Sequence, residues 1–259
     1  MRIAMPKPLI KAAGFILMTT TIAAPALSAE CSTKSPAQRV AVLELYTSEG
    51  CSSCPPADRW LSSIATAKIS SDKLIALAFH VDYWDYIGWK DRFAKPEYSG
   101  RQREQVVVSG KDTVFTPQVM LNGKNYRGWR NDAIFLQDLT QVNSHAASVN
   151  IELNVKQAAK DSVAVSALAN STSKDTELYL ALYENDLNSA VRAGENRGEQ
   201  LHHDYVVRQW LGPFNPSTPA NQTINLNPDW KTGDMGVVAL VQNRSNGEIL
   251  QAVASKLCS

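Results

Sequence analysis

Two cysteines three residues apart, Cys51 and Cys54, are the residues of this chain best suited to chemistry. An apolar run over residues 40–46 predicts a buried strand before them, and residues 57–65 carry apolar side chains at helical spacing. Cys51 therefore lies at the start of a predicted helix, where unpaired backbone N–H groups and the helix dipole favour a thiolate. A thiolate is the species that attacks disulfides, so the pattern indicates thiol–disulfide exchange.

The same Cys-x-x-Cys pair allows three other interpretations. A zinc site would need more ligands, and the chain has no second Cys-x-x-Cys or His-x-His pair, although His80 and a carboxylate could contribute. A dithiol can also capture soft ions such as mercury(II) or copper(I). A purely structural disulfide would close too short a ring to restrict the unfolded chain much. We expect no metal and no cofactor, and keep as the alternative a non-enzymatic binding or assembly module of the cell envelope.

The other two cysteines, Cys31 and Cys258, lie near the ends of the chain. Four cysteines allow three pairings. We favour Cys51–Cys54 and Cys31–Cys258, because the second bond would tie the two chain ends together. The alternative leaves Cys31 and Cys258 as free thiols, which are disfavoured outside the cytosol.

The first 29 residues predict a secretory signal rather than part of the fold. Arg2, Lys7 and Lys11 form a basic region, residues 12–26 are apolar and uncharged, and small residues lead to a cleavage site after Ala29. No stretch is long and apolar enough to span a membrane. We therefore expect a soluble periplasmic or secreted protein in which disulfides persist. A net charge of +1 argues against binding to nucleic acid or to an anionic membrane surface.

The chain around the cysteines predicts alternating strands and helices. A second apolar strand over residues 73–81 would close a right-handed parallel strand–helix–strand unit. The cysteine pair and the segment 80–86 would then share one sheet edge. Further on, the pattern predicts a helix over 96–107, a short strand over 118–121, a turn at Asn122–Gly123 with a return strand over 125–129, and a helix over 131–142 capped by Asn131.

The pattern becomes β-rich near residue 148, where we place a boundary between domains 30–147 and 148–259. Short strands at regular spacing predict an all-β sandwich, with strands over 149–155, 162–169, 177–183, 203–211, 222–226, 235–242 and 249–255. The polar stretch 194–208 is either a loop folded back on the cysteine pair or a charged hairpin at a sandwich end, which we favour. His202 and His203 would point to opposite faces of a strand and make a poor metal pair.

The motifs resemble those of the thioredoxin superfamily over roughly residues 39–145. They are the strand, the Cys-x-x-Cys at a helix start, and Thr116–Pro117 entering a short strand and hairpin. The segments 50–58 (GCSSCPPAD), 80–85 and 114–118 are similar to those of a secreted bacterial thioredoxin-like family of unknown function, over nearly the whole mature chain. The resemblance implies an α/β thioredoxin-like domain followed by an all-β sandwich-like domain.

The resemblance also implies roles for individual residues. Cys51 would be the nucleophile, as the more exposed sulfur, and Cys54 the resolving thiol. A cis bond at Thr116–Pro117 would present a backbone edge to the substrate, beside the sulfurs. Partners would be protein thiols or disulfides and an unknown redox partner. Ser52 and Ser53 stand where familiar relatives carry other residues, so the direction of electron flow stays open.

Two further candidates are Glu44 and His80. Glu44, on the strand leading to Cys51, could take the proton of Cys54, or could be a buried carboxylate that a neighbouring donor satisfies. His80 could carry protons near pH 7, although we favour a structural, hydrogen-bonded histidine. Tyr83 and Trp84, at the same sheet edge, could line a peptide groove or pack in the core.

Overall fold

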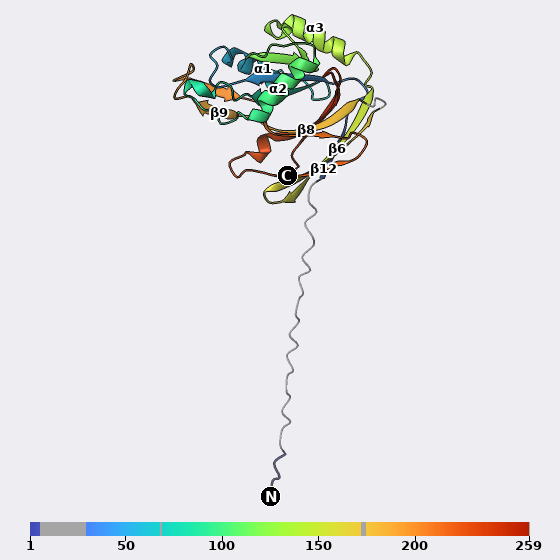
Figure 1. The fold of residues 1–259 in the computed structure, drawn as a ribbon. Helices are drawn as coiled ribbons and strands as arrows, with labels where there is room; N and C mark the ends of the chain where they lie inside the picture. Colours follow the sequence, from blue (N-terminus) through green and yellow to red (C-terminus); the bar gives the residue numbers. More distant parts are fainter. Residues whose placement is uncertain (6–29, 68, 172–174, 259) are drawn as a thin grey trace.

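The computed structural model describes residues 1–5, 30–67, 69–171 and 175–258. The protein is mostly β-sheet, with mixed sheets and few helices. The helices lie at one end of the molecule and the sheet that contains β6 (Val149–Ala159) and β12 (Ala220–Asn225) at the other (Figure 1). Apart from residues 1–5, the predicted signal segment lies outside the described residues. No described helix has the length and apolar character that a membrane span requires.

The cysteine pair belongs to an α/β layer that follows the predicted pattern. β2 (Ala41–Thr47) and β3 (Leu74–His80) run parallel and are joined by α1 (Pro55–Thr66). β4 (Gln118–Leu121) pairs antiparallel with β2. These contacts confirm the predicted strand–helix–strand unit and place the cysteine pair where β2 passes into α1.

The remaining elements of this layer largely match the sequence pattern. α2 spans Pro96–Val108, and α3 spans Asp132–Asn143, with the side chain of Asn131 accepting hydrogen bonds from the first turn of α3. A tight turn at Asn122 and Gly123, both with positive φ, leads into β5. β5 is only Lys124–Asn125 and a 3₁₀ turn, η2 (Gly128–Arg130), follows it, so the expected strand over 125–129 is wrong in its length.

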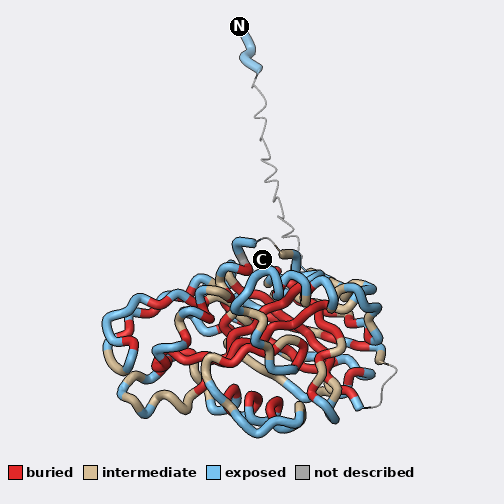
Figure 2. Tube along the Cα trace, turned by 90° about the horizontal axis from the view of Figure 1, so that it is seen from above, coloured by how far each residue is buried: buried red, intermediate tan, exposed pale blue. Residues whose placement is uncertain are grey.

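Strand alternation divides this layer into two cores. Leu43 and Leu45 of β2 face α1 and α3, whereas Val42 and Tyr46 face α2. Every residue of β2 is buried, because helices or strands cover both faces of the sheet. Seen from above, the buried residues follow the central strands and the exposed residues surround them (Figure 2).

Each of the seven β-rich segments predicted after residue 148 contains a strand. A four-stranded sheet, ordered β1-β6-β7-β12, packs through apolar side chains against β8, β13 and β14. Its strands are β1 (Glu30–Lys34), β6 (Val149–Ala159), β7 (Ser162–Ser171) and β12 (Ala220–Asn225). The strands β8 (Thr176–Glu184), β11 (Val206–Phe214), β13 (Met235–Asn243) and β14 (Ile249–Lys256) belong to the large sheet.

The large sheet crosses the boundary that the sequence predicted at residue 148. Its order is β14-β13-β8-β11-β3-β2-β4-β5, and β11 pairs in parallel with β3 at Val206 and Ala78. One sheet of the expected sandwich is therefore continuous with the sheet of the α/β layer. The sequence predicts one strand over residues 203–211. In the structure this strand is interrupted at Asp204–Tyr205, where Tyr205 has a φ of 58°.

The break separates β11 from a small hairpin that lies next to the cysteine pair. This hairpin consists of β9 (Leu187–Ala190) and β10 (Gln200–His203), paired antiparallel. β10 lies against α1. The sequence pattern did not indicate β1 or β9, and it indicated only the last residue of β10, His203.

A disulfide joins Cys31 of β1 to Cys258 beyond β14, with a Cα–Cα distance of 6.1 Å. The predicted pairing of the chain ends is therefore confirmed, and the alternative of free thiols is wrong. Disulfides are typical of proteins from oxidising compartments.

We expect the Cys31–Cys258 bond to contribute more to stability than the Cys51–Cys54 bond. It links residues 227 apart, and on the loop-entropy model such a bond stabilises by about 5 kcal/mol, against about 2 kcal/mol for a four-residue ring. Urea unfolding of the Cys31→Ser/Cys258→Ser and Cys51→Ser/Cys54→Ser double variants measures both. A larger loss of unfolding free energy in the second variant would contradict this account.

Candidate functional site

The cysteine pair, Cys51 and Cys54, forms a disulfide at the N-terminal end of α1. Its Cα atoms are 5.4 Å apart, and Cys54 is the N-cap residue of the helix. Both cysteines are 0% exposed, whereas Ser52 and Ser53 between them are exposed. The expectation that Cys51 is the more exposed sulfur is therefore wrong.

A polar loop between β9 and β10 lies over the cysteine pair; we call residues 194–199 the cover loop. The side-chain amide of Asn196, 5% exposed, donates to the backbone oxygens of Glu49 at 2.8 Å and Cys51 at 3.0 Å. The backbone N–H of Ser52 donates to the Glu195 carboxylate at 2.9 Å. The favoured interpretation of this stretch as a hairpin at a sandwich end is wrong, and the loop folded on the cysteine pair is confirmed.

Gly194 allows the cover loop to approach the rest of the site closely. Its φ is +74°, in the left-handed region that side-chain-bearing residues avoid. A Cβ atom there would lie 3.2 Å from Cβ of Trp89 and 3.3 Å from Cδ1 of Ile87. The loop therefore packs its backbone directly onto the segment that follows β3.

The turn at Thr116–Pro117 lies next to the cysteine pair and contains a cis peptide bond, as the resemblance implied. The hydroxyl of Ser53 lies 3.3 Å from Sγ of Cys51 and 3.5 Å from the backbone oxygen of Thr116. The indole N–H of Trp84 donates to the Thr116 hydroxyl at 2.6 Å. The structure thus brings the Cys51 sulfur, Ser53 and this turn together, and it gives Trp84 a part in holding the turn.

Glu44 does not reach the cysteine pair. It is fully buried, and one of its carboxylate oxygens lies 2.6 Å from Nη2 of Arg101, on α2. Glu44 shares the α2-facing side of β2 with Tyr46, whereas α1 packs against the opposite side. The structure therefore supports the alternative role of Glu44, a buried carboxylate satisfied by a neighbour, and not proton transfer with Cys54.

A cluster of buried ionisable side chains lies behind the cysteine pair; we call it the buried charge cluster. Nδ1 of His80 is 2.6 Å from Oδ2 of Asp91, which matches the favoured structural role of His80. Nε2 of His203 lies 3.4 Å from Oε1 of Glu49, and its Nδ1 lies 3.8 Å from Oδ1 of Asp58. The two imidazole rings contact each other edge to face, with centroids 4.9 Å apart.

Sequence reasoning missed His203, Glu49 and Asp58 as members of the site. Glu49 precedes Cys51 by two residues, and Asp58 follows Cys54 by four, which places Asp58 and Cys54 on one face of α1. The closeness of Glu49 and Asp58 to the cysteines in the sequence could have indicated that both belong to the site. His203 reaches them from β10, and no local pattern points to that contact.

The cluster holds a charged imidazole in the interior. Burial by itself would lower the pKa of His203, but the Asp58 and Glu49 carboxylates outweigh burial and raise that pKa to about 10. Burial works against a low pKa of the Asp91 carboxyl, but the neighbouring His80 brings it below its usual value. His203 is therefore protonated at neutral pH and balances part of the negative charge of the three carboxylates.

Within the described residues, no group of three or more His, Cys, Asp or Glu side chains is placed to hold a metal ion. His80, considered as a possible zinc ligand beside the cysteines, instead contacts Asp91. The buried charge cluster is therefore best described as a set of ion pairs.

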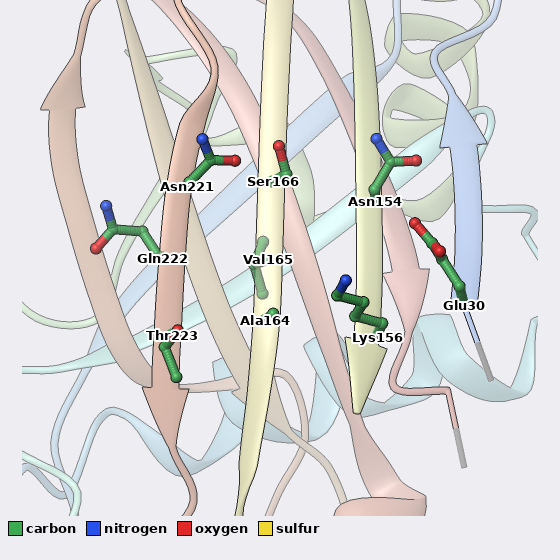
Figure 3. Close-up of a pocket in the computed structure, with 9 residues that line it drawn as sticks. All are labelled: Glu30, Asn154, Lys156, Ala164, Val165, Ser166, Asn221, Gln222 and Thr223. Carbon is green, nitrogen blue, oxygen red and sulfur yellow. The ribbon is translucent and has the colours of Figure 1, made fainter. Parts of the chain in front are cut away.

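A hollow of about 370 Å³ lies mainly on the outer face of the four-stranded sheet, away from the core (Figure 3). None of the described residues that line it is a cysteine, a histidine or an aromatic residue. Its lining is Glu30, Asn154, Lys156, Ala164, Val165, Ser166, Asn221, Gln222 and Thr223. We assign no chemistry to this polar surface.

Fold and site together define a mostly β protein with mixed sheets and a buried Cys-x-x-Cys disulfide at the start of a helix. A family model described as a protein of unknown function, DUF1223, matches residues 42–242. The chain therefore belongs to the DUF1223 family. Comparison with curated proteins gave no match.

Two solved structures share the fold over most of the chain. A protein from Agrobacterium tumefaciens is 27% identical, with a TM-score of 0.61, and the alignment covers 86% of this chain and 96% of that one. HBP35 of Porphyromonas gingivalis is 16% identical, with a TM-score of 0.66, over 86% of this chain and 76% of its own. The second likeness concerns the fold alone.

Replacing His203 should destabilise the protein, because it leaves Glu49 and Asp58 buried without their counter-charge. We expect His203→Gln to lower the unfolding free energy at pH 7 by about 3 kcal/mol. His202→Gln is the matched control: the side chain of His202, next to His203 on β10, is 45% exposed, so the change should stay within about 0.5 kcal/mol.

The difference between wild type and His203→Gln should depend on pH. Because the folded pKa of His203 is raised from 6.5 to about 10, its contribution is complete below pH 6.5 and is lost as the pH rises through 10. Denaturant unfolding at several pH values measures this. A difference that stays constant between pH 7 and pH 10 would contradict the ion-pair assignment.

Proposed function

We propose that the protein is a periplasmic or secreted thiol–disulfide oxidoreductase with a thioredoxin-like α/β half, acting through Cys51 and Cys54. The observation that carries the proposal is the cysteine pair at the N-terminal end of α1, with Sγ of Cys51 3.3 Å from the Ser53 hydroxyl. That hydroxyl lies between the sulfur and the cis Thr116–Pro117 turn. The β2–α1–β3 unit with antiparallel β4 supports the thioredoxin-like description that the sequence motifs imply.

In the reducing direction, the Cys51 thiolate attacks a substrate disulfide and forms a mixed disulfide, while one substrate sulfur leaves with the electron pair. The Cys54 thiolate then attacks Sγ of Cys51, which releases the second substrate thiol and closes the Cys51–Cys54 bond. Two electrons pass from the cysteine pair to the substrate, and the reverse sequence oxidises a dithiol. The helix dipole favours the Cys51 thiolate, and the Ser53 hydroxyl would stabilise it further by turning its proton from the backbone oxygen of Thr116 to Sγ.

Exchange requires Cys51, which is 0% exposed, to become accessible, and we propose that movement of the cover loop exposes it. Asn196 holds the loop by two hydrogen bonds to backbone oxygens, and Glu195 by one contact with Ser52. Each such bond stabilises by about 1 kcal/mol net, since water replaces the partner when the loop opens. An open form is therefore accessible from the closed one without unfolding of the sheet.

The burial of both sulfurs favours a second candidate, a non-enzymatic envelope module with a structural disulfide. The two proposals differ in the reduction potential of the cysteine pair, because structural disulfides have potentials below about −300 mV. Equilibration with glutathione or dithiothreitol buffers, followed by mass spectrometry of alkylated protein, measures this potential directly.

For the oxidoreductase, Cys51→Ser should abolish exchange with insulin or glutathione disulfide. Cys54→Ser should instead accumulate mixed disulfides on Cys51, because the resolving thiol is absent. Trapped adducts are visible on non-reducing gels and identifiable by mass spectrometry. The proposal fails when wild-type protein exchanges with neither these disulfides nor a reduced unfolded substrate.

Weakening the cover loop should speed the reaction of the cysteine pair. Asn196→Ala removes both hydrogen bonds to the cysteine segment, so we expect dithiothreitol to reduce the Cys51–Cys54 bond about tenfold faster. Asn221→Ala, on the outer face of the four-stranded sheet, is the matched control. Equal rates for wild type and Asn196→Ala would show that the loop does not limit access.

A further inference from the structure

A hollow of about 300 Å³ borders the Thr116–Pro117 turn, which lies next to the cysteine pair. Pro117 forms part of its wall, together with aromatic side chains from the segments before and after β4. Phe115 is 41% exposed there, and the ring of Trp129 packs against Trp60 of α1 at 5.7 Å between centroids. The hollow therefore offers apolar surface on a rigid support.

The hollow is connected to the reactive sulfur through short contacts. Sγ of Cys51 lies 3.3 Å from the Ser53 hydroxyl, which lies 3.5 Å from the backbone oxygen of Thr116. The next residue, Pro117, lines the hollow. A ligand that spans the Thr116–Pro117 turn would reach both the hollow and the Cys51 sulfur.

Two exposed arginines give the hollow a positive charge. Arg127 and Arg130 both line it, and in the described chain neither forms an ion pair with a carboxylate. The guanidinium of Arg130 lies 5.1 Å from the ring centroid of Trp129. Asp138, on the neighbouring helix α3, instead accepts a hydrogen bond from the hydroxyl of Tyr126 at 2.9 Å. Neither guanidinium group forms an ion pair among the described residues, so both remain able to bind an anion.

We propose that this hollow selects carboxylate-bearing disulfides and thiols as substrates of the cysteine pair, with the carboxylate at Arg127 and Arg130. Guanidinium groups bind carboxylates through paired hydrogen bonds, and the aromatic walls accept the apolar part of the same ligand. The inference rests on the proposed oxidoreductase function and adds the charge of its substrate. The carboxylate can belong to a small thiol or to an acidic peptide, and both share this chemistry.

The test compares three small disulfides of similar size and different charge. They are dithiodipropionate, which is anionic, bis(hydroxyethyl) disulfide, which is neutral, and cystamine, which is cationic. Stopped-flow fluorescence follows the oxidation by each of protein in which Cys51–Cys54 is reduced and Cys31–Cys258 is intact, and rates are divided by those of dithiothreitol with the same disulfide to remove intrinsic reactivity. A cystine peptide with glutamates beside its cysteines, compared with its glutamine counterpart, extends the test to peptides.

Variants of the two arginines test whether a preference for the anionic disulfide comes from the hollow. In Arg127→Gln/Arg130→Gln the ratio of the anionic to the neutral rate should fall about tenfold, which corresponds to one charge-assisted hydrogen bond. Arg127→Lys/Arg130→Lys should retain part of the ratio. Arg244→Gln, at an exposed position of the β13–β14 turn that does not line the hollow, should keep the wild-type ratio.

The possible failures are distinguishable. Wild-type protein that reacts with none of the disulfides would overturn the proposed function, and the inference with it. Reaction with all of them, at a ratio that the double glutamine variant does not change, would overturn the inference alone. An equal fall in Arg244→Gln would also overturn it, because the effect would then come from the overall charge of the protein.

Discussion

The parallel contact between β11 and β3 is the constraint on which the site depends. It is made at Val206, three residues after His203, so it fixes where β10 ends relative to the cysteine segment. The Glu49 and Asp58 carboxylates are buried beside that end, and a buried charge without a partner is costly. His203 supplies the compensating charge. The C-terminal strands are therefore part of the cysteine site, and not merely an appended domain.

The same attachment sets the access to Cys51. β9 and β10 flank the cover loop, and the hairpin they form positions Asn196 over the backbone of the cysteine segment. A change in how β10 packs on α1 would alter the ion pairs of His203 with Glu49 and Asp58. It would also alter the contacts of the cover loop with the cysteine segment. Stability and reactivity of the site are thus linked through one hairpin.

Local patterns predicted the elements of this fold well, because apolar periodicity and turn residues act over short distances. They could not assign the face of Glu44: β2 is buried on both sides, so its sequence lacks the alternation that would indicate which side α1 covers. The contact of Asn196 with Glu49 joins residues 147 apart, and neither residue carries a local signal of it. The break before β11 depends on Tyr205 at a positive φ, which tertiary contacts impose against its preference.

The reactivity of a buried sulfur depends on which groups cover it. Beneath packed apolar side chains, exposure of Cys51 would require loss of core contacts, and the disulfide would be inert. Here the cover is a polar loop whose amide and carboxylate groups exchange their partners for water when it opens. The core between α1 and β2 is built from apolar side chains such as Leu61 and Leu45, which pack with other apolar residues of the strands and helices. The burial of Cys51 beneath such a loop is therefore compatible with the exchange chemistry that we propose.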